Sequence, residues 1–119
     1  MDLADKLQLK PGNSVAIVNE PGDIALDLGD AHPAADDPRE ADAVIVFCTD
    51  SAELDGLRDQ YVPPAARDVL TWVAYPKAGK LGTDLNRDVL AEVVMREDVR
   101  PVRQIALDDV WSALRLRPA

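Results

Sequence analysis

The sequence predicts a small three-layer α/β domain with a mostly parallel sheet and an antiparallel hairpin at its carboxyl end. Apolar runs rich in β-branched residues alternate with amphipathic segments, which is the pattern of strands joined by crossover helices. Aromatic residues make up only 4% of the chain, so valine, leucine, alanine and isoleucine must fill most of the interior. The last two apolar runs lie too close together for a helix between them, and they should therefore pair antiparallel.

The first predicted elements are a short helix and a buried strand. Asp2 to Gln8 consists of helix-forming residues, with Leu3 and Leu7 four apart on one face, and the Pro11-Gly12 turn ends this helix. Val15 to Val18 is a continuous apolar run bounded by turn residues, which predicts a strand.

The middle of the chain predicts one weak strand, one strong strand and a helix. Residues 24–28 offer at most a short edge strand, whereas residues 43–48 are apolar throughout, as expected for a central parallel strand covered on both faces. Leu54 and Leu57 then recur at helical spacing before Pro63-Pro64 interrupts the pattern. Three adjacent residues can each cap this helix: Thr49, Asp50 and Ser51.

The last third of the chain predicts a strand, the best helix and a closing hairpin. Val69 to Tyr75 is the third apolar run, and residues 102–107 and 113–116 form the hairpin around an acidic turn. Thr83 or Asp84 should cap the helix between them. The apolar face of that helix consists of Leu85, Val89, Leu90, Val93 and Val94. We interpret Trp72 and Trp111 as core residues.

Composition excludes several function classes. The 119 residues suit one domain, 1–119, and the net charge of −9 disfavours nucleic-acid binding, which depends on cations. The acidic residues concentrate between about 20 and 42, which is typical of a solvated loop. No apolar run approaches the roughly 20 residues of a membrane span, so we expect a cytoplasmic protein without membrane contact. Cys48 lies in an apolar run and should be buried and unreactive.

Polar residues follow the ends of three predicted strands, where open parallel sheets place their ligands. Helix N–H groups at this edge attract anions, and Lys77 would strengthen that attraction, while Glu20 and Asp50 would oppose it. Lys77 has the alternative role of a solvated turn residue. The candidate ligand edge comprises Asn19, Glu20, Thr49, Asp50, Tyr75 and Lys77.

The acidic segment does not predict a metal site. Asp30, His32, Asp36 and Asp37 have the chemistry of metal ligands, but their spacing lacks the regularity and turn glycine of an oxygen-rich loop. His32 is the only histidine, so a relay or metal site with two histidines is excluded. We therefore expect no metal.

Leu9 to Val18 looks like the lead-in to the first strand of class I S-adenosylmethionine-dependent methyltransferases. These enzymes continue with a glycine-rich turn that lets the backbone approach the cofactor, but the turn here is Asn19-Glu20-Pro21-Gly22-Asp23. They also need an acidic residue after the second strand, for which only Asp27 or Asp30 is available. We expect no bound S-adenosylmethionine.

Three stretches carry a second resemblance, which extends over nearly the whole chain: Leu9 to Gly12, Trp72 to Lys77 followed by Thr83 to Leu85, and Asp109 to Leu114. In these stretches the sequence resembles a family of small bacterial proteins known only as a domain of unknown function. The resemblance implies a shortened methyltransferase-like, Rossmann-like fold and no known activity.

Two function hypotheses follow. The favoured one is a non-enzymatic Rossmann-like domain that binds a small ligand or a protein partner, with no cofactor and no catalytic residue. The alternative is a diverged methyltransferase-like enzyme that holds its cofactor at the strand ends marked by Asn19, Thr49 and Tyr75. A thermal-shift screen with S-adenosylmethionine, nucleotides and anions distinguishes them.

Overall fold

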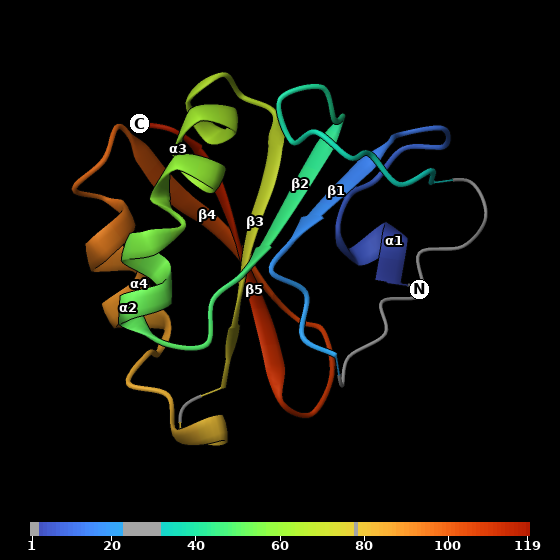
Figure 1. The fold of residues 1–119 in the computed structure, drawn as a ribbon. Coiled ribbons are helices and arrows are strands. Elements are labelled where there is room, and N and C mark those ends of the chain that lie inside the picture. Colours follow the sequence, from blue (N-terminus) through green and yellow to red (C-terminus); the bar gives the residue numbers. More distant parts are fainter. Residues whose placement is uncertain (1–2, 23–31, 78) are drawn as a thin grey trace.

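The computed structural model describes residues 3–22, 32–77 and 79–119. The described strands form one sheet in the order β1-β2-β3-β5-β4 (Figure 1). The first three strands pair in parallel, and β5 pairs antiparallel with both β3 and β4. The predicted parallel sheet with an antiparallel closing hairpin is therefore confirmed. The strands are β1 (Val15–Val18), β2 (Ala43–Phe47), β3 (Leu70–Pro76), β4 (Val99–Ala106) and β5 (Trp111–Pro118).

Helices cover the sheet unequally. In Figure 1, α2, α3 and α4 lie on one face, and α1 lies on the other with the amino-terminal segment. This arrangement gives the three predicted layers, although the third is thin. No helix among the described residues is long and apolar enough to cross a bilayer. The helices are α1 (Leu3–Lys6), α2 (Ser51–Gly56), α3 (Arg58–Ala66), the 3₁₀ turn η1 (Lys80–Gly82) and α4 (Arg87–Val94).

Strand β2 is buried on both faces, which explains its uninterrupted apolar sequence. Val44 and Val46 pack into the core beneath α2, α3 and α4, whereas Ile45 and Phe47 pack into the core on the α1 side. Because side chains alternate along a strand, a central strand of a covered sheet must be apolar at every position. The placement of residues 43–48 near the sheet centre is confirmed.

The two tryptophans belong to the core on the α1 side, as predicted. The Trp72 indole is fully buried, and its Nε1–H donates to the Leu7 carbonyl oxygen at 3.0 Å. Trp111 is 2% exposed, and its ring meets Phe47 edge-on with centroids 5.2 Å apart. Cys48 is also buried, and burial raises the pKa of its thiol to about 12.

The helix after β2 differs from the prediction, because it does not end before Pro63-Pro64. The chain breaks at Leu57 and continues as α3 through both prolines to Ala66. Proline lacks the N–H of a helical hydrogen bond, which disfavours this arrangement. Burial of Tyr61, Pro64 and Ala65 offsets that loss, so packing overrides the local signal.

The start of α4 also differs from the prediction. Asn86 is the cap, and its side-chain oxygen accepts from the Val89 N–H at 2.9 Å. The predicted caps are used elsewhere, because Thr83 accepts from the Leu85 N–H and Asp84 from Ser51. Strand β4 begins three residues before its predicted start and ends one residue before its predicted end, and β5 extends two residues beyond both predicted ends. Residues 24–28 lie outside the described residues.

Candidate functional site

The carboxyl edge of the sheet gathers three of the predicted ligand-edge residues around Glu53. The Asn19 side-chain amide donates to the Phe47 carbonyl oxygen at 2.9 Å and to Glu53 Oε1 at 3.0 Å. The Thr49 N–H donates to the same Oε1 at 2.9 Å, and Asp50 caps α2. Asn19 adopts a φ of 59°, in the left-handed region that asparagine tolerates better than most residues. Sequence analysis missed Glu53, although a carboxylate three residues after a cap is a known signal.

Carboxylates of the chain accept hydrogen bonds from backbone N–H groups at the start of α2. Asp50 Oδ1 accepts from the Glu53 N–H at 2.9 Å, and Asp84 Oδ1 accepts from the Ser51 N–H at 2.9 Å. The hydrogen bonds from Ser51 lower the pKa of Asp84, which keeps it ionised. The Thr49 N–H donates to Glu53, so the N–H groups of Thr49, Ser51 and Glu53 all donate to carboxylates of the same chain. A phosphate would have to displace them.

The remaining predicted residues take other roles at this edge. Tyr75 is buried, its hydroxyl accepts from Gln104 Nε2 at 2.9 Å, and burial raises its pKa. The Lys77 N–H donates to the Val110 carbonyl oxygen at 2.7 Å, which ties the end of β3 to the loop before β5. Glu20 is exposed. Among the described residues, no hydrogen bond joins Tyr75 or Lys77 to the Glu53 cluster.

The described residues of the acidic segment have different partners. The His32 Nδ1 lies 3.2 Å from the Asn13 carbonyl oxygen, and Asp37 pairs with Arg39. Asp27 and Asp30 lie outside the described residues. Within the described ranges, no group of three or more histidine, cysteine, aspartate or glutamate side chains is placed to hold a metal ion.

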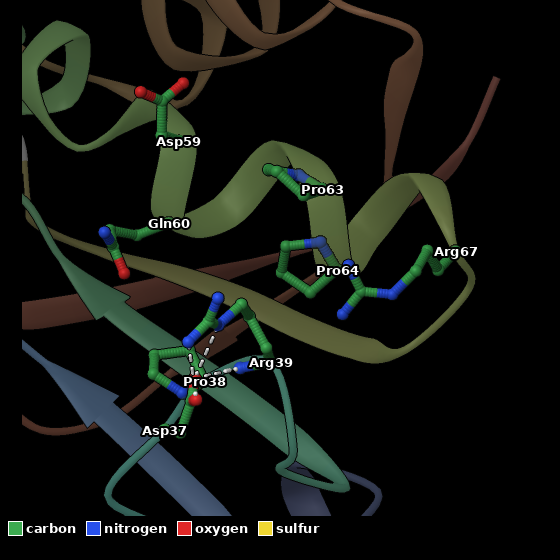
Figure 2. Close-up of a pocket in the computed structure, with 8 residues that line it drawn as sticks. All are labelled: Asp37, Pro38, Arg39, Asp59, Gln60, Pro63, Pro64 and Arg67. Carbon is green, nitrogen blue, oxygen red and sulfur yellow. Dashed lines mark hydrogen bonds and ion pairs between the residues drawn. The ribbon is translucent and has the colours of Figure 1, made fainter.

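A cleft of about 480 Å³ lies between residues 37–39 and α3, and sequence analysis missed it. Figure 2 shows the Asp37–Arg39 ion pair on one wall and the α3 side chains on the other. The hydrogen bonds from Arg39 lower the pKa of Asp37, so this pair satisfies its own charges. Arg67 makes no ion pair with any residue that the structure describes. The other lining residues are Pro38, Asp59, Gln60, Pro63 and Pro64.

A second cleft, of about 380 Å³, lies at the opposite edge of the sheet, where the parallel strands begin. We call it the amino-edge cleft. It combines the segment after α1 with the start of β3 and the end of β5, which are far apart in sequence. Its lining residues are Gln8, Lys10, Asn13, Asp68, Leu70 and Arg115.

Comparison with known proteins supports the fold. No family model and no curated protein matches the chain. The structure is similar to the crystal structure of a protein in the NADB-Rossmann superfamily from Streptococcus agalactiae, with a TM-score of 0.54 and 9% sequence identity. The similarity covers 100% of this chain and 71% of that chain. At this identity it shows the fold alone, which is Rossmann-like.

Proposed function

We propose that this chain is a non-enzymatic Rossmann-like binding domain. The observation that supports this most directly is the state of the carboxyl edge. In cofactor-binding members of this fold, the strand-to-helix turn leaves its N–H groups open for a phosphate or carboxylate of the cofactor. Here the strand-to-helix turn that the structure describes lies between β2 and α2, and Asp50, Glu53 and Asp84 accept hydrogen bonds from its N–H groups.

Electrostatics support the same conclusion. An anionic cofactor at this edge would lie against Glu20 as well as the three carboxylates of the turn, and like charges cost free energy at close range. The candidate ligand edge of Asn19, Glu20, Thr49, Asp50, Tyr75 and Lys77 therefore favours a neutral or cationic small ligand over a nucleotide. Binding of such a ligand requires no displacement of the carboxylates.

The clefts add a chemical argument for binding. None of the described residues that line either cleft is serine, cysteine or histidine, so neither cleft offers one of these side chains as a nucleophile. The one cysteine, Cys48, is buried with a pKa of about 12, and a thiol with that pKa carries little thiolate at neutral pH.

We extend the proposal to the finer family resemblance, a shortened methyltransferase-like domain of unknown function. The stretches that carry it have structural roles: Leu9 to Gly12 leads into β1, Trp72 to Lys77 contains most of β3, and Asp109 to Leu114 begins β5. They support a shared fold, and a shared activity does not follow from them.

Isothermal titration calorimetry with S-adenosylmethionine and with NAD tests the proposal. We expect no saturable heat with either. Glu53→Gln with Asp55→Asn as the matched control asks whether the carboxylate excludes the cofactor, because both residues lie on α2 but only Glu53 holds the turn. A micromolar dissociation constant of the unmodified chain for either cofactor would overturn the proposal, and one for S-adenosylmethionine would favour the methyltransferase-like alternative.

A further inference from the structure

The amino-edge cleft concentrates positive charge in a chain whose net charge is −9. Lys10 and Arg115 line it, and Arg103 is paired directly with Arg115 across the β4–β5 ladder, so both arginine side chains project to the same face. The acidic lining residue, Asp68, is held by Arg117 through hydrogen bonds of 3.0 and 2.9 Å. Its charge is therefore already matched.

Arg115 is incompletely satisfied. Its Nη1 donates to Gln8 Oε1, and its Nε is enclosed without a hydrogen-bond partner among the described residues. A guanidinium has five N–H donors, and enclosed donors without partners cost free energy. Burial and the positive charges of Arg117 and Arg103 lower the pKa of Arg115, and the negative charge of Asp68 opposes that shift. A negative charge bound beside Arg115 would favour its charged form.

We propose that the amino-edge cleft binds a small anion that carries a carboxylate or phosphate group, held between Arg115 and Lys10. The planar guanidinium presents paired N–H donors to either group, and the lysine ammonium adds an adaptable point charge. Gln8 and Asn13 supply neutral hydrogen-bonding groups, and Leu70 supplies an apolar surface. The inference rests on the proposed binding function and gives it a ligand class at the edge opposite to the one that Rossmann-like folds use for cofactors.

The indole N–H signals of Trp72 and Trp111 show whether binding is confined to the amino-edge cleft. Trp72 is the cross-strand partner of Arg115, and its indole donates to Leu7, the neighbour of Gln8. Trp111 lies at the other end of β5. We would titrate the ¹⁵N-labelled chain with inorganic phosphate and with acetate, each against sodium chloride at equal ionic strength. We expect a saturable shift of the Trp72 indole signal and no shift of the Trp111 signal, and the tighter of the two anions identifies the preferred group.

Variants make the test specific. Lys10→Gln should raise the dissociation constant of the preferred anion about tenfold, because the variant removes a cation from a partly enclosed site. Lys10 is exposed, so folding is not in question, and Lys80→Gln, an exposed lysine on η1, is the matched control. Arg115→Lys should also weaken binding, because a lysine cannot reproduce the paired donors. The inference would be overturned if the Trp72 signal did not saturate with either anion. Equal losses of anion affinity in Lys10→Gln and Lys80→Gln would also overturn it. Binding of S-adenosylmethionine or NAD that leaves the Trp72 indole signal unchanged would instead overturn the proposed function, so the two failures are distinguishable.

Discussion

Replacing Trp111 by alanine tests how the core on the α1 side is built. The indole is 2% exposed, and its partner Phe47 is fully buried. The two rings meet at 76° with centroids 5.2 Å apart, which is the favourable edge-to-face arrangement. Truncation removes nearly all of this buried surface and leaves a cavity, because Phe47 is held in the fully buried strand β2 and close-packed neighbours collapse only partly into such a space. Substitutions of this kind cost roughly 3–5 kcal/mol, and we expect about 4 kcal/mol here.

Equilibrium urea unfolding followed by far-ultraviolet circular dichroism measures this loss of unfolding free energy, since that signal arises mainly from the backbone amides and not from the removed indole. Val102→Ala on the neighbouring strand β4 is the matched control, because Val102 is 38% exposed and should lose less than about 1 kcal/mol. Trp111→Phe keeps a ring and provides a folded comparison if the alanine variant falls below the stability threshold. A loss below about 1 kcal/mol in Trp111→Ala would refute the assignment of the ring to the core.

Two further predictions concern buried titratable groups and a helix cap. Burial raises the pKa of Cys48 from 9.0 and that of Tyr61 from 10.0, each to about 12. Both groups keep their protons in the folded chain after the unfolded chain has lost them, so unfolding free energy should fall as the pH rises from about 9 towards 12. Urea unfolding across this range should show a shallower fall in Cys48→Ala, and an identical slope would contradict this account. Asn86→Ala should cost about 1 kcal/mol in thermal unfolding, whereas Asn86→Asp should retain the cap, and equal losses would show that the cap contributes nothing.

The strands were predictable because their signals are local. Residues 15–18 and 43–47 are apolar in sequence because neighbours cover both faces, so the pattern and its cause coincide. Helix boundaries were less predictable, since several residues near residue 84 have capping side chains and only tertiary structure selects among them. Asp84 accepts a hydrogen bond from Ser51, which is 33 positions away in the chain, and Asn86 caps α4 instead.

Neither cleft was predictable from sequence for a related reason. The amino-edge cleft combines Gln8, Asp68 and Arg115, and no motif links residues that lie so far apart in the chain. The parallel pairing of β1, β2 and β3 brings their carboxyl ends to one edge, as the sequence predicts, but the sequence does not show which groups accept hydrogen bonds from the N–H groups there. Sequence analysis did not single out Glu53, because the sequence does not show that Thr49 and Asn19 both donate hydrogen bonds to it.

The carboxylates at the carboxyl edge both stabilise the fold and oppose the approach of an anion. Asn19 joins the end of β1 to Phe47 and Glu53, and Asp84 joins the segment before α4 to the start of α2. A turn left open for a cofactor has unpaired N–H groups until the cofactor binds, and such groups must otherwise be met by water. Here internal carboxylates accept hydrogen bonds from such groups, and together with Asn19 they join β1, β2, α2 and the segment before α4. An entering phosphate would have to break these hydrogen bonds and approach several negative charges. The contacts that stabilise this edge therefore oppose anion binding there, and Lys10 and Arg115 at the opposite edge offer the complementary charge.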